Sequence, residues 1–406
     1  MIKLNRTLLS GSFILLIAFN IFAILNFIFQ FSMARFLSIV DYGILATLFS
    51  IIYILSIFTE SIQTVLTKYS ASVSDKSKLK NLFKRSSRIA LKVSVYAFVI
   101  YAVLSIFLSN EKFLNIPYSI LILNGLFIFG AFFMPITRGL MQGRKMFKSL
   151  GFNMVLESAV KLVVAISLVL ALTQTWKLYG AIASILIGAA VAYLFSLYSL
   201  KDILRSKEKN ANTKEIYNYA GPVFFVTLII VVFYSLDIIL ARMFLSEIQT
   251  GYYAIASVLS KAIFWGTLPI SKAMFPLTAE NNKKKKDKNV FSSSILILSV
   301  LIAIGIVAFY FLPDLAVRIF AGRYIPESAG ILFYLVLATS LVSFANLNLL
   351  YKLSIGKTKG YLLLIIFIVI EVFLMWYFSG SLIQFSLAFL TSSAIFLWGS
   401  IVLLSR

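Results

Sequence analysis

About twelve apolar stretches divide this 406-residue chain, and most of them are long enough to cross a membrane. A helix needs about 20 apolar residues to span a hydrocarbon core of about 30 Å. Because lipid offers the backbone no hydrogen-bond partners, such stretches must be helical. A mean hydropathy of +0.97 with only 13% charged residues excludes an ordinary soluble globule. The sequence therefore predicts an all-α integral membrane protein, with spans near 9–33, 43–66, 89–109, 117–138, 150–173, 178–200, 218–241, 251–275, 291–312, 328–350, 361–378 and 382–404.

The basic residues fall into alternate gaps between these stretches. Short loops rich in Lys and Arg stay on the cytoplasmic side, and 28 of the 37 basic residues lie in seven gaps that share one side of the membrane. These gaps are Lys3 to Arg6, Lys68–Lys92, Arg138–Lys148, Lys201–Lys214, Lys283–Lys288, Lys352–Lys359 and Arg406. The six intervening gaps hold only Arg35, Lys112, Lys177, Arg242, Arg318 and Arg323. We therefore expect a multi-pass protein of the cell membrane with both termini cytoplasmic.

The net charge of +22 belongs to the cytoplasmic gaps, because acids and bases elsewhere in the chain cancel. In a soluble chain this excess would suggest nucleic acid binding, but here it indicates topology and attraction to anionic lipid headgroups. The chain has no Cys and no His, so disulfides, thiolate chemistry, the usual zinc ligands and the commonest general base are absent. No cofactor, metal or nucleic-acid partner is expected.

A polar gap at 201–214 divides the chain into two halves of six spans, expected as lobes 1–206 and 207–406. A motif at the end of the first span returns, with one residue inserted, at the end of the seventh. Its two copies are Ala34, Arg35, Leu37, Ser38, Tyr42, Gly43, Ala46 and Ala241, Arg242, Leu245, Ser246, Gly251, Tyr252, Ala254. Because each half begins in the cytoplasm and has an even number of spans, the pattern predicts parallel repeats with substrate bound between two lobes.

Span 8 carries the most informative charges inside the membrane. Lys261 and Lys272 are eleven residues apart, about three helical turns, so they share a face that also carries Trp265. A charge at a helix centre costs about 2.5–3.5 kcal/mol on insertion, so a cationic stripe that meets a phosphate is the functional hypothesis. The alternative is that Lys272 reaches the cytoplasmic surface while Lys261 pairs with an acid. Gly266 and Pro269 predict a helix break between the two lysines.

Three ionisable residues mark spans 5 and 11. Glu157 and Lys161 are four residues apart and are expected to pair along their helix. This pair is either a neutralised structural contact or a base that is released when another anion arrives. Glu371 has only apolar helical neighbours, so it must find a base on another helix, bind a cation or hold a proton.

Other charges have weaker claims to function. Glu60 in span 2 and Asp237 in span 7 are candidates for ion coupling or charge balance, although Asp237 can also pair with Arg242 or Arg35 near the outer surface. Arg138 ends span 4, where a cytoplasmic anchor is the alternative to a substrate contact.

One apparent phosphate-binding motif is incomplete. Gly356, Lys357 and Thr358 imitate the end of a Walker loop, but the position that requires the first glycine holds Tyr351 and no strand precedes it. The chain is not expected to carry its own ATPase. Energy for any transport would come from an H+ or Na+ gradient, the membrane potential or the substrate gradient.

Short motifs over nearly the whole chain resemble one transporter superfamily. They are Ala34–Ala46 with Ser38, Asp41, Tyr42 and Gly43; Arg138, Gly139, Leu140, Gln142 and Gly143; Asp237–Phe244; Gly251, Tyr252 and Tyr253; and Phe320, Gly322, Arg323 and Tyr324. These motifs are similar to those of the multidrug, oligosaccharidyl-lipid and polysaccharide exporter (MOP) superfamily, in particular its polysaccharide, or Wzx-type, flippase branch. The resemblance implies two six-helix lobes in a V around a central cavity, alternating between inward-open and outward-open states.

The same resemblance implies a substrate. Such flippases move polyprenyl-diphosphate-linked oligosaccharide from the cytoplasmic to the outer leaflet for cell-surface polysaccharide or glycan assembly. The expected partners are this lipid, membrane lipids and glycan-assembly enzymes, around a monomeric protein. The expected substrate site comprises Lys261, Lys161, Arg138, Lys272 and Trp265. The candidates for coupling to H+ or Na+, or for charge balance, are Glu371, Glu157, Glu60 and Asp237.

Two other functions remain open. A drug or cation exporter of the same superfamily would favour acids in its cavity, whereas here three bases face four acids inside the membrane. A membrane glycan polymerase or glycosyltransferase would resemble proteins with a large outer loop bearing acids or histidine. This chain has neither, so an enzyme is not expected.

Overall fold

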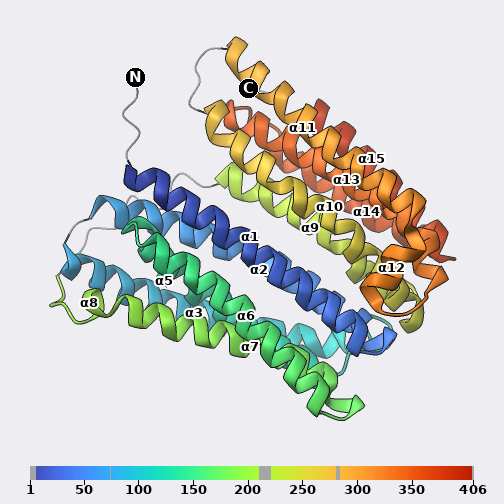
Figure 1. The fold of residues 1–406 in the computed structure, drawn as a ribbon, viewed down its shortest axis with the longest axis horizontal. Helices are drawn as coiled ribbons and strands as arrows, with labels where there is room; N and C mark the ends of the chain where they lie inside the picture. The colour runs from blue at the N-terminus through green and yellow to red at the C-terminus, as the bar shows by residue number, and fades with distance from the viewer. Residues whose placement is uncertain (1–5, 74, 210–220, 280–283, 405–406) are drawn as a thin grey trace. The chain divides into compact units, whose positions relative to one another are not determined.

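The computed structural model describes residues 6–73, 75–209, 221–279 and 284–404, and within these ranges the regular elements are helices (Figure 1). The expected positions of Lys3, Lys214, Lys283 and Arg406 lie outside these ranges. The helices are α1 (Arg6–Phe36), α2 (Ile39–Ser72), α3 (Lys76–Leu108), α4 (Tyr118–Gly125), α5 (Phe127–Gly143), α6 (Phe147–Ala171), α7 (Gln174–Ser199), α8 (Lys201–Leu204), α9 (Gly221–Phe244), α10 (Glu247–Ala279), α11 (Lys284–Phe311), α12 (Pro313–Ala321), α13 (Pro326–Ser354), the 3-10 helix η1 (Tyr361–Leu364), α14 (Ile365–Tyr377) and α15 (Leu382–Val402).

The prediction of an all-α integral membrane protein is confirmed. In the described part of the chain, eleven helical segments are long and apolar enough to cross a membrane, and a shorter apolar segment, Tyr361–Tyr377, coincides with the predicted span 11. Several helices continue beyond the predicted spans. The third span was expected from residue 89, but α3 begins at Lys76, where the Asp75 carboxylate accepts a hydrogen bond from the Ser77 backbone N–H. Asp is a favoured residue at this capping position, so the helix starts where the cap is.

The described residues form two compact units. Unit 1 draws on residues 1–37 and 55–220, and unit 2 on residues 38–54 and 221–406. The expected lobes, 1–206 and 207–406, stay a prediction. The first half of α2 belongs to unit 2, because residues 38–54 pack with the helices of that unit.

In unit 1, α6 packs against both α1 and α7. The contact with α7 depends on Gly188, since a Cβ at this position would lie 2.7 Å from the Glu157 carbonyl oxygen and 3.0 Å from the Lys161 Cβ. The absence of a side chain lets α7 approach the turn of α6 that carries both charged residues.

The connection between the halves begins on the surface of unit 1. Lys84 Nζ lies 2.7 Å from a Glu208 carboxylate oxygen, and Lys80 Nζ donates to the Ser206 carbonyl at 2.6 Å. Hydrogen bonds from Lys84 and Asn81 lower the pKa of Glu208. Residues 206–208 are therefore tied to the N-terminal part of α3.

In unit 2, the repeated sequence motif becomes a helix contact. A Cβ on Gly43 would lie 3.0 Å from the Gly251 backbone nitrogen, and one on Gly251 would overlap the Ile39 carbonyl. The corresponding glycines of the two motif copies therefore bring α2 and α10 into backbone contact.

The turns that precede these two helices share one capping arrangement. Before α2, Ser38 Oγ donates to Asp41 and accepts from the Asp41 N–H. Before α10, Ser246 Oγ accepts from the Gln249 N–H, while the Gln249 side chain accepts from the Ser246 N–H. A Ser hydroxyl that accepts from the backbone N–H three residues later fixes where a helix begins, and both copies of the motif have this bond.

The outer connection before α13 contains an element that the sequence analysis did not anticipate. Residues predicted as a loop form α12, which starts at Pro313 and ends where Gly322 adopts a φ of 69°. Pro in the first turn and Gly in the left-handed conformation after the last turn are common helix boundary signals. Both are readable in the sequence.

Candidate functional site

Unit 2 holds a buried ion pair between α9 and α10. Lys261 Nζ lies 2.7 Å from Asp237 Oδ1, and the two residues are 5% and 0% exposed. Asp237 Oδ2 accepts from Ser257 Oγ at 2.6 Å and from the Tyr253 hydroxyl at 3.3 Å. Both carboxylate oxygens of Asp237 therefore have donors that the protein supplies.

Aromatic rings surround this ion pair. The Lys261 ammonium lies 5.0 Å from the centroid of the Tyr234 ring, a cation–π distance. Tyr234 stacks on Phe264, and its hydroxyl accepts from Trp265 Nε1 at 3.0 Å. The half-buried Trp265 also meets the half-buried Tyr53 edge to face, with ring centroids 5.5 Å apart. The predicted neighbours Lys261 and Trp265 thus share one aromatic environment.

Glu371 approaches the same pair from α14. Its side chain is fully buried, and within the described residues neither carboxylate oxygen has a hydrogen-bond partner. It interacts electrostatically with Asp237 and Lys261. Glu371 therefore interacts electrostatically with a base on another helix, without a hydrogen bond to it among the described residues.

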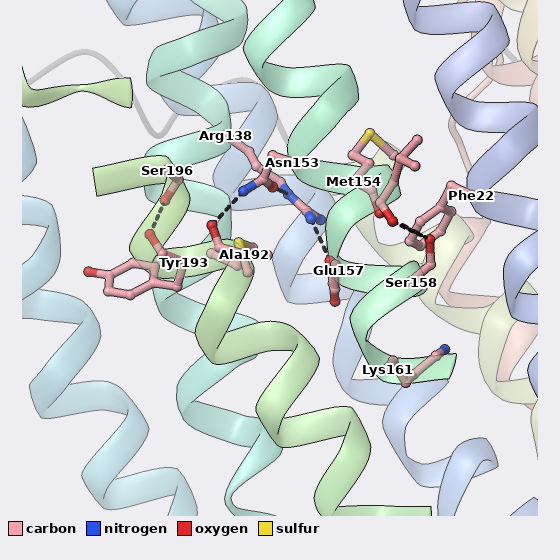
Figure 2. Close-up of polar contacts among 12 residues, drawn as sticks. Phe22, Arg138, Asn153, Met154, Glu157, Ser158, Lys161, Ala192, Tyr193 and Ser196 are labelled. Carbon is pink, nitrogen blue, oxygen red and sulfur yellow. Dashed lines mark hydrogen bonds and ion pairs between the residues drawn. The ribbon is translucent and has the colours of Figure 1, made fainter. Parts of the chain in front are cut away.

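Unit 1 holds a second buried base, Arg138 on α5. Its Nε donates to Asn153 Oδ1 at 2.7 Å, and its Nη2 forms an ion pair with a Glu157 oxygen (Figure 2). The Asn153 amide donates in turn to the Ala192 carbonyl of α7 at 2.6 Å. This hydrogen-bonded chain joins α5, α6 and α7.

Two glycines allow the helix that carries Arg138 to pack closely against α2. A Cβ on Gly143 would lie 2.5 Å from the Thr67 carbonyl oxygen, and one on Gly139 would lie 2.9 Å from the Gln63 carbonyl oxygen. These residues allow α5 to lie directly on the second half of α2. Arg138, next to Gly139, is only 9% exposed, so it is not the surface anchor offered as the alternative.

Lys161 lies one helical turn beyond Glu157, and Figure 2 shows its side chain extending away from Arg138. Its ammonium donates to the Asn26 side-chain oxygen of α1 and lies 4.6 Å from the centroid of the Phe29 ring. Lys161 is 7% exposed. It therefore lies between α6 and α1.

The observed ion pairs differ in part from the expected ones. Glu157 forms an ion pair with Arg138 and also interacts electrostatically with Lys161. Asp237 pairs with Lys261, so Lys261 has the acid partner that its alternative expected. Arg242, one expected partner of Asp237, lies 3.0 Å from Glu247 instead. In each case the observed partner comes from a neighbouring helix or turn, which helical spacing alone does not reveal.

The structure also bears on the expectations for Lys272, Glu60 and the helix break. Lys272 and Glu60 are exposed, so the structure does not bring them into either buried cluster. The expected helix break at Gly266 and Pro269 is wrong, because α10 is helical without interruption from Glu247 to Ala279. Proline removes one backbone donor, here the N–H that would face the Trp265 carbonyl, and the surrounding helix tolerates that loss.

Several neutral residues of these clusters were not predicted from the sequence. On α10, Tyr253 and Ser257 precede Lys261 and Trp265 at intervals of four residues. On α6, Asn153 precedes Glu157 and Lys161 at the same interval. Residues four apart lie on one helix face. The positions four and eight residues before Lys261, and four residues before Glu157, would therefore have identified Ser257, Tyr253 and Asn153. Asn26 and Tyr234 have no comparable signal.

The comparisons with known proteins agree with this architecture. Residues 8–282 match the family model described as polysaccharide biosynthesis protein. An uncharacterised membrane protein of Methanocaldococcus jannaschii is 23% identical over 83% of this chain and 83% of its own length.

Solved structures share the fold. A multidrug resistance MATE family transporter of the MOP superfamily, in its inward-facing conformation, superposes with a TM-score of 0.77 at 14% identity and covers 94% of this chain and 93% of its own. Lipid II flippase MurJ, inward closed, superposes with a TM-score of 0.69 at 15% identity and covers 95% and 87%. The chain is a multi-pass membrane protein that belongs to the polysaccharide biosynthesis protein family.

Proposed function

We propose that this protein moves polyprenyl-diphosphate-linked oligosaccharide from the cytoplasmic to the outer leaflet by alternating access, without enzymatic chemistry on the substrate. The observation that carries the proposal is the burial of Lys261 in a membrane helix. A lysine at such a depth costs free energy on insertion, and a function is the ordinary reason for its presence. Arg138 and Lys161 repeat the pattern in unit 1.

The substrate's diphosphate matches these bases. It is the part of a lipid-linked sugar that hydrocarbon excludes most strongly. Basic side chains can donate hydrogen bonds to it in place of the water molecules that it loses. Arg138 and Lys261 are each held by a carboxylate. A phosphate oxygen entering either cluster would exchange with that carboxylate, so the base passes from one anion to another without becoming unpaired.

Half-buried aromatic side chains beside Lys261 support binding of the sugar. The Tyr234 ring lies against the Lys261 ammonium and its hydroxyl accepts from Trp265, which meets Tyr53 edge to face. Such amphipathic rings combine apolar surface with a polar group. We assign the sugar nearest the diphosphate to this aromatic pair.

The carboxylates supply the coupling in this proposal. Asp237 and Glu157 each neutralise a base, and a cation that binds to the acid releases the base for phosphate. Either H+ or Na+ entering from outside would act in this way, in exchange for outward movement of the lipid. Glu371 is the acid best suited to bind an ion because its oxygens have no hydrogen-bond partner among the described residues.

A binding experiment tests the substrate class. Purified protein is heated with polyprenyl-diphosphate oligosaccharide, with the polyprenol lacking phosphate, and with a lipophilic cation. Ligands that bind the folded state raise the unfolding temperature. We expect a rise with the diphosphate lipid alone.

Arg138→Gln is expected to weaken binding of the diphosphate lipid about tenfold or more in the same assay. A hydrogen bond to a charged group is worth about 1.5–3 kcal/mol, and Gln cannot provide the guanidinium fork. Arg144→Gln is the matched control, because Arg144 Nη1 donates to the Val73 carbonyl at the end of α2 and contacts neither cluster. Equal affinities for the two variants would remove Arg138 from the site.

The drug or cation exporter remains a second candidate because of one observation. Glu371 is a buried carboxyl group without a hydrogen-bond partner in the described residues, and an organic cation is one possible partner for it. A rise in unfolding temperature with the lipophilic cation, and none with the diphosphate lipid, would favour this function.

A further inference from the structure

We propose that Asp237, Lys261 and Glu371 form a proton site that excludes sodium, in which the Lys261 ammonium already takes the place of a bound cation and Glu371 carries the exchangeable proton. This inference narrows the coupling part of the proposed function to one ion. Its tests measure proton and ion binding directly, so they stand or fall separately from lipid transport.

The Asp237 carboxylate already has a cation beside it. Lys261 Nζ lies 2.7 Å from Asp237 Oδ1, the distance of a charge-assisted hydrogen bond. The other Asp237 oxygen accepts from Ser257 and Tyr253. Both oxygens of this carboxylate are therefore engaged by donors that the protein itself supplies.

The net charge of the cluster depends on whether Glu371 is ionised. Asp237 and Lys261 form an ion pair, so their charges cancel without Glu371. An ionised Glu371, fully buried and with no donor on either oxygen among the described residues, would add an uncompensated charge. Burying such a charge is far more costly than protonating the group. Glu371 is therefore expected to hold a proton while Lys261 remains on Asp237.

The surroundings of Glu371 contain few other titratable groups. Helix α14 packs against α9, α15 and η1. Helix α9 contributes Asp237, and its Arg242 pairs with Glu247, whereas α15 contains no charged residue and the one titratable residue of η1 is Tyr361. From α10, Lys261 and Tyr253 interact with Glu371. The charge on Lys261 is thus the main influence that favours an ionised Glu371.

The site also distinguishes a proton from sodium. A hard metal cation that leaves water needs several oxygen ligands in place of its hydration shell. With Asp237 engaged, Glu371 offers two oxygens, and a cation beside them would meet repulsion from the nearby ammonium. A proton needs one oxygen and forms a neutral carboxylic acid. The arrangement therefore favours protonation over sodium binding.

Infrared spectroscopy tests where the proton resides. The purified protein at neutral pH is expected to show the C=O band of a buried protonated carboxylic acid, and Glu371→Gln is expected to lose that band. Glu327→Gln is the matched control, because Glu327 is an exposed acid in the first turn of α13, and it should keep the band. Absence of the band, or its persistence in Glu371→Gln, would overturn the proposal.

Sodium binding tests the role of the ammonium. Unfolding temperatures are compared in sodium chloride and choline chloride at equal ionic strength. The unsubstituted protein is expected to show no difference. Lys261→Met removes the tethered cation and leaves the carboxyl groups of Asp237 and Glu371 without its charge, so this variant should gain a sodium-dependent rise.

Two outcomes of this measurement contradict the proposal. A sodium-dependent rise in the unsubstituted protein that Glu371→Gln abolishes would identify a sodium site instead. A folded Lys261→Met variant that does not respond to sodium would show that the ammonium does not stand in for a cation. If Lys261→Met does not fold, the sodium response of the unsubstituted protein and the infrared band still decide the question.

Discussion

Lys261→Ala is expected to abolish the appearance of the glycan on the outer face of the cell, at unchanged protein level in the membrane, whereas Lys261→Arg should retain part of the transport. The alanine variant loses the base proposed to receive the diphosphate, and arginine restores a positive charge with different geometry. Surface labelling of the glycan, normalised to the amount of protein in the membrane, measures the effect.

This substitution also leaves Asp237 buried without its ion-pair partner. Breaking a buried pair in this way costs about 3–5 kcal/mol of stability, so a misfolded variant must be distinguished from an inactive one. The double variant Lys261→Met, Asp237→Asn removes both charges and should restore folding without restoring transport. Normal export by Lys261→Ala would remove Lys261 from the mechanism.

Gly251→Ala is expected to reduce the amount of folded protein sharply. A Cβ at this position would overlap the Ile39 carbonyl, which belongs to the backbone of α2 and cannot rotate away. Overpacking of a core typically costs about 1–3 kcal/mol, and occasionally more. A backbone clash between two helices belongs at the upper end of that range. Fluorescence-detected gel filtration and thermal unfolding measure the loss.

Gly266→Ala is the matched control because it lies in the same helix and a Cβ there would meet nothing within 4 Å. In a helix interior, Ala is about 0.5–1 kcal/mol more favourable than Gly, so this variant should unfold at the same temperature or slightly higher. Equal unfolding temperatures for Gly251→Ala and the control would show that α2 and α10 do not approach each other as described.

The membrane fold was readable from the sequence because two strong signals agree. Span length and the alternation of basic gaps both depend on the bilayer and not on the details of packing. The helix ends were less accurate: α3 begins thirteen residues before the expected span because Asp75 caps a helix that extends beyond the hydrocarbon core. The residues of α3 that lie before the expected span need not be apolar, because they are outside the hydrocarbon core.

The sites were readable only in part. Lys261, Lys161 and Glu371 stood out because ions inside a membrane segment are costly. Their partners did not, since the pairing of Asp237 with Lys261 depends on how α9 and α10 are rotated and aligned relative to each other. Arg138 shows the same limit: its position at a helix end suggested an anchor, and only its contact with Glu157 reveals a buried group.

Transport by the purified protein in liposomes tests the central claim most directly. A fluorescent polyprenyl-diphosphate oligosaccharide is placed in both leaflets, and a membrane-impermeant reagent removes the fluorescence that it can reach. With the unsubstituted protein, we expect the reagent to reach nearly all of the lipid, whereas in liposomes containing Lys261→Ala it should reach only the outer leaflet. Protein-loaded liposomes that keep the inner-leaflet lipid protected, while they move a lipophilic cation, would contradict the proposal that this protein is a lipid-linked oligosaccharide flippase.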